Sequence, residues 1–303
     1  MIINQYDFLY KIKWWIKKHP ILILPMVSHN EELAAKREAL FEFVEIETFN
    51  RCNGGCSFCP ANKDIDKRKP TFMDEKLFYK IIDELAELNY SGRLALFSNN
   101  EPFLDKRMDG FIKYTRKKLP KAYIYIYCNG TLLTVERVKD IIDSLDKLVI
   151  DNYNDNLELI PSVESISKFC QNNSSIDKKI EIYVRKEHEV LSNRGNQAPN
   201  KKEKPKVQKI KCLLPFVQMV IRPDGKVSLC CNDVYGNYTM GDCNKNKLTE
   251  IWWSNRYKKV RKRIREQGRR GIKICRYCDN TTAAAVSLKY GKKRFLFSRK
   301  KKE

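Results

Sequence analysis

The sequence predicts an α/β fold: a partial (β/α) TIM-like barrel of about five or six parallel strands, followed by a small C-terminal unit made of a β-hairpin and a helix. Between residues 41 and 192, short apolar runs rich in β-forming residues alternate with segments whose apolar residues recur at helical spacing. Repeated strand-then-helix units are typical of a parallel sheet with helices outside it. Further on, a Pro-Asp-Gly turn at 223–225 separates two β-rich arms, which predicts the hairpin.

The same periodicities place the elements of the barrel in order. Strands are expected at 43–49, 93–97, 123–127, 147–151 and 180–184, with helices between them at 73–89, 107–118, 134–144 and 157–170. The first helix carries the most regular apolar stripe, which runs from Leu77 to Leu88. Thr134 can cap the third helix. Because ligands of such folds bind at the carboxyl ends of the strands, we expect functional residues in the loops that follow them.

The polar stretch before the hairpin contains glycine and proline and indicates a linker or an active-site loop. After the hairpin, a helix is expected from Leu248 through a basic stretch to Gln267. The expected parts of the chain are an N-terminal basic and aromatic extension, the barrel, the linker, the hairpin-plus-helix domain and a basic tail, at 1–40, 41–192, 193–211, 212–285 and 286–303.

The chain has 303 residues and eleven cysteines, which are too few for a disulfide scaffold at this length. Their grouping in C-x2-C units indicates metal binding in a reducing compartment. The sequence shows no secretory signal and no apolar run of membrane-spanning length. We therefore expect a cytoplasmic protein without a transmembrane segment.

Lysine and arginine give the chain a formal net charge of +22. Such a charge attracts acidic partners, among them a phosphorylated substrate, a nucleotide sugar, an acidic peptide, nucleic acid or an anionic membrane. A lysine-rich surface without a function is an equal alternative. The aromatic and lysine-rich segment at 8–18 could lie on a membrane interface, but we expect its aromatic face to pack on the domain.

The most informative motif follows the first strand, where Cys52, Cys56 and Cys59 form a C-x3-C-x2-C loop. Three thiolates can hold three corners of a cubane iron–sulfur cluster and leave the fourth iron open to another ligand. The glycine pair at 54–55 lets the loop fold back so that the sulfurs converge. The alternatives are a zinc site, which normally takes four protein ligands, or scattered core thiols.

This loop resembles that of the radical S-adenosylmethionine (SAM) superfamily. In that family, the open iron of a [4Fe–4S] cluster binds the amino and carboxylate groups of SAM, and an electron from the cluster cleaves SAM to a 5′-deoxyadenosyl radical. The resemblance implies that Phe58, just before the third cysteine, lies beside the adenine of SAM. Ordinary loop packing is the alternative for Phe58.

Two strand-end motifs extend the resemblance. After the second strand the family usually has Gly-Gly-Glu-Pro, which contacts the amino group of SAM; here Asn99 and Asn100 replace the glycines before Glu101. Asparagine tolerates left-handed backbone angles, so the turn can be kept. The resemblance implies that Asn100 and Glu101 bind SAM. After the third strand, Asn129 and Gly130 match an Asn-Gly pair of the family, which makes Asn129 a further candidate.

The fourth and fifth strands end in charged residues, at positions where the family binds SAM. Asp151 is the candidate for contacting the ribose hydroxyls. Arg185 could pair with the SAM carboxylate through a bidentate fork. For both residues, a solvated charge at a strand end is an equal alternative.

A second set of cysteines, Cys212, Cys230, Cys275 and Cys278, lies in the C-terminal part. Four thiolates complete a tetrahedral set with no open position. The arrangement resembles the SPASM domain of radical SAM maturases, in the shortened twitch form known from the aminocyclitol dehydrogenase of butirosin biosynthesis. That form implies a single auxiliary [4Fe–4S] cluster, with Cys231 as a spare thiol. Zinc knuckles have similar spacings and are the alternative.

These motifs predict a radical SAM oxidoreductase that removes a hydrogen atom from a small hydroxylated sugar or cyclitol. The auxiliary cluster would help it to dehydrogenate or epimerise that substrate. Arg194 lies in a segment similar to one near the substrate cavity of twitch proteins, so it could orient the substrate or lower the pKa of a substrate group. The alternative is a surface arginine. The expected partners are an anionic small-molecule or peptide substrate and an electron donor such as flavodoxin or ferredoxin.

Two other functions fit parts of the sequence. One is a peptide-modifying radical SAM maturase, although the roughly forty residues before the first strand are few for a leader-binding domain. The other is a zinc-knuckle nucleic-acid-binding protein, which the positive charge favours and the strand-end motifs argue against. Nucleic acid is therefore not the partner that we expect.

Overall fold

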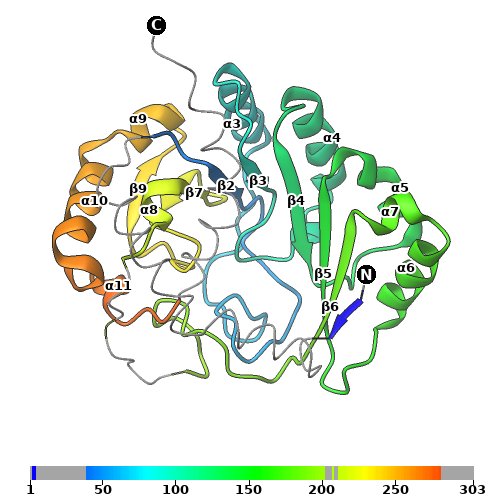
Figure 1. Ribbon diagram of the computed structural model, residues 1–303. Helices are drawn as coiled ribbons and strands as arrows, with labels where there is room; N and C mark the ends of the chain where they lie inside the picture. The colour runs from blue at the N-terminus through cyan, green and yellow to red at the C-terminus, as the bar shows by residue number, and fades with distance from the viewer. Residues whose placement is uncertain (1, 5–38, 202–206, 208–210, 281–303) are drawn as a thin grey trace, which may run out of the picture.

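A computed structural model describes residues 2–4, 39–201, 207 and 211–280 of the chain (Figure 1). The aromatic and lysine-rich segment at 8–18 and the basic tail at 286–303 lie outside the described residues, and so does most of the predicted extension at 1–40. The structure is the predicted α/β fold, in which helices cover the outer side of a curved parallel sheet.

The described strands form one continuous sheet in the order β1-β6-β5-β4-β3-β2-β7-β8-β9. Strands β1 to β7 run parallel to their neighbours, and β8 and β9 extend the sheet in antiparallel pairing. Their bounds are Ile2–Asn4, Phe43–Ile46, Arg93–Ala95, Tyr123–Cys128, Lys147–Tyr153, Ile180–Arg185, Gln218–Ile221, Lys226–Ser228 and Thr239–Asp242. The parallel part is therefore wider than the sequence predicts, because β1 and β7 join its two sides.

Figure 1 shows helices α3 to α7 along the outer side of β2 to β6, and α9 to α11 on the flank beside β7 to β9. The α-helices α3 to α11 span Glu75–Glu87, Met108–Lys118, Val135–Ile141, Pro161–Gln171, Ser174–Asp177, Leu214–Val217, Leu248–Trp252, Asn255–Gln267 and Lys273–Arg276. Short 3-10 turns η1 to η3 cover Pro102–Leu104, Ile142–Ser144 and Gly268–Gly271. None of the helices in the described part of the chain has the length and apolar character that crossing a membrane requires.

Helix α3 illustrates how local sequence sets an element. The side chain of Asp74 accepts a hydrogen bond from the N–H of Leu77 at 3.2 Å, so the helix begins at Glu75. The predicted apolar stripe is buried against the sheet: Leu77, Phe78, Ile81, Ile82 and Leu85. Leu88 was expected in this stripe but is 36% exposed, because the helix has already ended at Glu87.

Two predicted helices differ from the observed ones. The helix expected at 157–170 begins only at Pro161, because Leu157 has a left-handed φ of 62°. Asn152 holds the loop between them by donating to the carbonyl oxygen of Glu158 at 2.8 Å. The helix expected from 248 to 267 is broken into α9 and α10, since Ser254 caps a new helix by accepting from the N–H of Tyr257 at 3.4 Å.

The hairpin and the barrel share one hydrophobic core. Strand β7 pairs in parallel with β2, which places Gln218 opposite Phe43. Trp252, at the end of α9, is fully buried, and its ring packs edge-on against Phe41 with 5.4 Å between ring centroids. Its Nε1 also donates to the carbonyl oxygen of Ala39 at 3.0 Å. The barrel and the predicted hairpin-plus-helix domain are therefore packed together as one body. That the two parts have separate functions stays a prediction.

A buried ion-pair cluster ties the segment after the cysteine loop to the end of β2. Glu47 is 1% exposed and lies 3.5 Å from Nη1 of Arg68. Arg68 also pairs with Asp66 at 2.8 Å and donates to the carbonyl oxygens of Asn50 and Val234. Burial raises the pKa of Glu47 to about 8, and Arg68 opposes this shift only in part.

This shift makes the stability of the fold depend on pH. A buried carboxyl with a raised pKa keeps its proton in the folded chain after the unfolded chain has lost it, so its contribution to stability falls from pH 4.5 to about pH 8. Urea denaturation at pH 5.5 and pH 8.5 measures how much the free energy of unfolding decreases between these two pH values. In Glu47→Gln this decrease should be smaller than in the wild type by about 3 kcal/mol. Glu87→Gln, on the exposed end of α3, should keep the wild-type decrease, and equal decreases in all three proteins would refute the assignment.

Candidate active site

The carboxyl ends of the parallel strands surround a cavity of about 340 Å³, which we call the first cavity. Its walls come from the cysteine loop, from the segment after β3, from the carboxyl ends of β4 to β6 and from residues 191–194. All residues that the sequence predicts for the first cluster, for SAM and for the substrate line this one cavity: Cys52, Cys56, Phe58, Cys59, Asn100, Glu101, Asn129, Asp151, Arg185 and Arg194. Their individual roles stay predictions.

The cysteine loop is folded back by contacts that the sequence did not reveal. The amide Nδ2 of Asn62 donates to the carbonyl oxygens of Gly55 at 2.7 Å and Cys56 at 3.0 Å. The N–H of Gly55 donates to Oε1 of Glu187 at 3.0 Å, and a Cβ at this glycine would lie 2.9 Å from that oxygen. A larger residue at position 55 would therefore displace the Glu187 carboxylate from this hydrogen bond. Asn62 and Glu187 are ordinary polar loop residues in the sequence, so no motif marks them.

The thiols of this loop lie where a thiolate has little stabilisation from the protein. Burial raises the pKa of Cys52 to about 12 and also raises the pKa of Cys56, and the neighbouring thiols add to both shifts. A bound metal cluster supplies the positive charge that keeps such thiols deprotonated. The loop therefore fits a [4Fe–4S] cluster on Cys52, Cys56 and Cys59.

Glu101 joins three loops at the floor of the first cavity. It is 2% exposed, and its carboxylate accepts backbone N–H groups from Asn129 at 2.7 Å and Phe103 at 3.2 Å. Its own N–H donates to the carbonyl oxygen of Arg51 at 2.9 Å, in the cysteine loop. Burial raises the pKa of Glu101 to about 7, while the two accepted hydrogen bonds oppose the shift. Glu101 is thus a buried carboxyl and not a solvated one.

Asn129 also connects loops. Its Nδ2 donates to Oδ1 of Asn53 in the cysteine loop at 2.7 Å, and its Oδ1 accepts from the N–H and the hydroxyl of Thr131. Asn53 in turn donates to the Thr131 hydroxyl at 2.9 Å. The side chain of Asn129 therefore holds the cysteine loop against the turn after β4.

Asp151 and Arg185, which the sequence assigns to separate parts of SAM, form an ion pair with each other, at 3.3 Å. Burial raises the pKa of Asp151, and Arg185 opposes this. Arg185 also lies over the ring of Tyr153, at 5.9 Å from its centroid, and Phe58 packs on the same ring at 5.9 Å. The pair and the two rings form one wall of the first cavity.

Three buried donor atoms in the lining of this cavity find no hydrogen-bond partner among the described residues: Nδ2 of Asn100, Nε of Arg185 and Nε of Arg194. A buried donor without a partner costs free energy, so such groups indicate a ligand that accepts hydrogen bonds. SAM carries a carboxylate and ribose hydroxyls that can accept them. The residues present therefore fit SAM in this cavity.

Arg194 approaches the cavity from a tight turn, with a left-handed φ of 50°. Its Nη2 donates to Oδ1 of Asn99. Beside it, Glu45 on β2 accepts from the hydroxyl of Ser98 at 2.7 Å and from Nε2 of Gln218 on β7 at 2.6 Å. Burial raises the pKa of Glu45 to about 7, against the effects of Ser98, Arg194 and Gln218.

The sequence analysis missed Glu45, although a signal for it exists. Glu45 and Glu47 stand at alternate positions of an apolar strand, and alternate side chains share one face of a strand. Two acids on one face of an otherwise apolar strand indicate that this face meets a polar interior.

The C-terminal thiols, Cys212, Cys230, Cys275 and Cys278, line a second cavity. The first three are each 9% exposed, and burial raises the pKa of all three. Cys231 does not line this cavity, and its N–H donates to Oε1 of Gln218. Four thiols around one buried space fit a cluster that has no open position.

One turn connects the two cavities. Arg194 lines the first cavity, and the next residue, Gly195, lines the second. Asn193, which is 0% exposed, anchors this turn. Its Nδ2 donates to the carbonyl oxygen of Tyr277 at 2.5 Å, and its backbone N–H donates to Oδ1 of Asp279 at 2.8 Å. Arg194, which lines the first cavity, is therefore next to a residue fixed to the segment that carries the last two cysteines.

Comparison with known proteins gives matches over both parts of the chain. The family model of the radical SAM superfamily matches residues 46–182, and the SPASM model, an iron–sulfur cluster-binding domain, matches residues 212–279. The S-adenosyl-L-methionine-dependent 2-deoxy-scyllo-inosamine dehydrogenase of Niallia circulans is 27% identical over 247 residues, which cover 81% of this chain and 95% of that protein.

Solved structures match as well. The crystal structure of BtrN in complex with AdoMet and 2-DOIA has a TM-score of 0.69 and 25% identity, and the match covers 81% of this chain and 96% of that one. The anSMEcpe structure with bound AdoMet has a TM-score of 0.52 and 15% identity, over 84% of this chain and 94% of that one, and shows a similarity of fold alone.

The contacts of Asn62 lead to a prediction about metal retention. Asn62→Ala removes both hydrogen bonds that fold the cysteine loop back, so we expect weaker iron binding by the first site, by about tenfold or more, as for other residues that orient metal ligands. Anaerobic reconstitution followed by iron analysis and electron paramagnetic resonance (EPR) with and without SAM should show this loss. Asn244→Ala, on the far hairpin, is the control and should keep wild-type iron; an Asn62→Ala variant with wild-type iron and SAM response would contradict the prediction.

Proposed function

The chain belongs to the radical SAM superfamily and carries a C-terminal SPASM domain, and from this premise we propose that it dehydrogenates a small hydroxylated substrate of the sugar or cyclitol type. As an oxidoreductase of this superfamily, it uses SAM, a [4Fe–4S] cluster and an auxiliary iron–sulfur cluster. We assign Cys52, Cys56 and Cys59 to the first cluster and the four thiols of the second cavity to the auxiliary cluster. Epimerisation, which begins with the same hydrogen abstraction, is the alternative reaction.

The turn at 193–195 is the observation that carries this proposal. A substrate in the first cavity that touches Arg194 lies one residue away from the lining of the second cavity. Removal of a hydrogen atom from an alcohol carbon leaves one electron and one proton to be removed before the carbonyl is complete. A redox cluster next to the substrate cavity suits that second electron.

The lining of the first cavity suits a polyhydroxylated substrate. Ser98, Asn99 and Ser192 contribute hydroxyl and amide groups, and Arg194 contributes a guanidinium. The rings of Phe97 and Tyr127 stack with their centroids 5.0 Å apart and give the cavity an apolar wall. The relative from Niallia circulans is named for its action on an inosamine, and BtrN was solved with 2-DOIA, which together favour an aminocyclitol or a related compound.

The size of the first cavity argues against the peptide alternative. Its volume of about 340 Å³ is near the lower end of the range for small-molecule sites. SAM has to share this space with the substrate. A compact substrate therefore fits better than an extended peptide.

The residues of the chain position the substrate and remove its proton. When bound, SAM and the first cluster supply the hydrogen-abstracting radical, and the auxiliary cluster takes up the second electron. Arg194, held by Asn99, donates a hydrogen bond to the hydroxyl that is to be oxidised and favours loss of its proton. The proton passes to the Ser98 hydroxyl, which lines the cavity, and from there to Glu45 at 2.7 Å. A carboxyl with a pKa of about 7 is suited to this role at neutral pH.

The partners and location follow from this chemistry. Cleavage of SAM consumes one electron per turnover, so we propose a one-electron donor of the flavodoxin or ferredoxin type. Free thiols that bind iron–sulfur clusters need a reducing compartment, which favours the cytoplasm.

Hydrogen transfer tests the proposed reaction directly. With a cyclitol deuterated at the carbinol carbon, we expect deuterium in 5′-deoxyadenosine and one ketone formed per SAM consumed, and about eight irons per chain after anaerobic reconstitution. Mass spectrometry of both products provides the measurement. Deuterium transfer without a ketone, with inversion at that carbon, would assign epimerisation instead. Transfer from a labelled peptide but from no cyclitol or sugar would refute the substrate class.

The proton route predicts a pH profile. In the wild type, the rate of ketone formation should rise with pH up to about 7, because Glu45 accepts the proton only when ionised. Glu45→Gln should lose this rise and about 100-fold in rate at pH 8, while SAM cleavage without substrate stays close to that of the wild type. Glu47→Gln, next along the same face, is the control and should retain the rise. A Glu45→Gln enzyme with the wild-type pH profile would exclude the route.

A further inference from the structure

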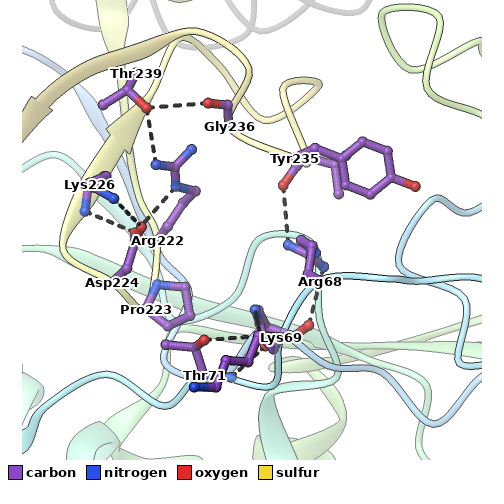
Figure 2. Close-up of a pocket in the computed structure, with 12 residues that line it drawn as sticks. Arg68, Lys69, Thr71, Arg222, Pro223, Asp224, Lys226, Tyr235, Gly236 and Thr239 are labelled. Carbon is purple, nitrogen blue, oxygen red and sulfur yellow. Dashed lines mark hydrogen bonds and ion pairs between the residues drawn. The ribbon is translucent and has the colours of Figure 1, made fainter.

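A third cavity, of about 440 Å³, lies apart from both cluster sites and shares no lining residue with the first cavity (Figure 2). One wall is the segment that follows the cysteine loop, with Lys69 and Thr71. The other wall is the hairpin turn between β7 and β8, together with the segment at 234–239 that leads into β9. Neither the radical SAM reaction nor the auxiliary cluster makes use of this cavity.

The hairpin turn fixes the position of Arg222. Its backbone N–H donates to the carbonyl oxygen of Lys226 at 3.0 Å and its carbonyl accepts from Gly225 at 2.9 Å, which closes the turn. Its side chain is held by Thr239, at 3.1 Å from Nη2, and by Asp224, at 3.4 Å from Nε. Figure 2 shows the guanidinium between these two partners, at the edge of the open space.

Gly236 makes room for this guanidinium. A Cβ at this position would lie 1.1 Å from Nη1 of Arg222, and the residue has a left-handed φ of 64°. Only glycine satisfies both conditions. Nη1 lies against Gly236 and makes no hydrogen bond with the part of the chain that the structure describes.

The opposite wall presents Lys69 from a braced turn. Asn50 donates from Nδ2 to the carbonyl oxygen of Lys69 at 2.9 Å, and its Oδ1 accepts from the N–H of Thr71 at 2.9 Å. The Thr71 hydroxyl donates to the same Lys69 carbonyl at 3.0 Å. The Lys69 side chain is exposed, and its ammonium has no ion-pair partner among the described residues.

The charges of this cavity do not balance. Arg68, which also lines it, is neutralised by Asp66 at 2.8 Å and donates to the backbone carbonyls of Asn50 and Val234. The other lining cations, Lys69, Arg222 and Lys226, face one carboxylate, that of Asp224. An excess of two positive charges around a concave space attracts a doubly charged anion. A phosphate ester carries about that charge at neutral pH.

We propose that this third cavity is a binding site for a phosphate-bearing small molecule, either a free phosphate or diphosphate or the diphosphate of a nucleotide. Arg222 supplies its charge and the N–H groups of Nη1, which the described part of the chain leaves unpaired, and Lys69 and Lys226 supply charge from the two walls. The site does not rest on the proposed reaction, because none of its residues lines the first or the second cavity.

A ligand in the third cavity would touch the segments that support the cysteine loop. Asn50 immediately precedes the loop, and the hydroxyl of Tyr235 donates to the carbonyl oxygen of Pro60 at 3.1 Å, directly after the third cysteine. Occupancy of this cavity is therefore placed to stabilise the cluster-bearing loop from behind.

Titration calorimetry with the cluster-loaded, full-length protein tests this site, with inorganic phosphate, inorganic pyrophosphate and ADP as probes in 150 mM (about physiological) sodium chloride. We expect one saturable site per chain, with pyrophosphate binding more tightly than phosphate. Tighter binding of ADP than of pyrophosphate assigns the site to a nucleotide, and equal binding assigns it to the inorganic anion. Lys69→Gln should weaken binding by about fivefold and Arg222→Gln by about 50-fold, since the arginine loses both charge and paired hydrogen bonds.

Lys121→Gln removes the same charge from an exposed lysine outside this cavity and is the matched control, which should bind as the wild type does. In Lys69→Gln, the thermal unfolding temperature and SAM cleavage without substrate should remain at wild-type levels. Weaker anion binding by this variant is then not caused by a loss of folding. The proposal is overturned if the wild type shows no saturable binding, or if all three variants bind alike. It is also overturned if a poly-glutamate peptide binds where pyrophosphate does not, because that result assigns this face to an acidic protein.

Discussion

A buried carboxylate holds together the loops on which the chemistry of this chain depends. Glu101 accepts N–H groups from the turns after β3 and β4, and its own N–H binds the cysteine loop at Arg51. Parallel strands end at one edge of a sheet, but their loops do not by themselves meet. An acid buried at this edge requires its hydrogen bonds, since leaving them unmade would cost several kcal/mol, about 1–3 for each unpaired group. The three loops are therefore held at fixed positions relative to one another.

Desolvation explains why the pKa values of thiols are raised at both cysteine sites. Burial disfavours a free thiolate in both groups of cysteines and raises the pKa of Cys52, Cys56, Cys212, Cys230 and Cys275. The positive charge of a bound iron–sulfur cluster would reverse this preference, because it supplies a counterion that the protein does not. The same principle applies to the carboxyls of Glu45 and Glu47, because burial raises their pKa values to about 7 and about 8.

The continuous sheet explains how the two cysteine-lined cavities come to lie next to each other. Strand β7 pairs with β2, so the hairpin that carries Cys230 is built onto the strand that leads into the cysteine loop. Gln218 on β7 then binds both Glu45 on β2 and the backbone of Cys231. The short turn through Arg194 and Gly195 is a second connection between the two cavities. A division into independently packed domains would leave this geometry to a flexible linker, whereas one shared core fixes it.

The sequence alone determined what depends on neighbours in the chain. The cysteine spacings, the alternation of strands and helices, and the turn and cap residues identified the family, the fold class and the residues that line the first cavity, because each pattern is local and strands end where ligands bind. Only the tertiary structure decided the pairing of β7 with β2, the contacts of Asn62 and Glu187 with the cysteine loop, and the pairing of Asp151 with Arg185. It also formed the third cavity, whose walls lie more than a hundred residues apart in the chain. Such contacts depend on which segments meet after folding, and no spacing or propensity within one segment encodes that meeting.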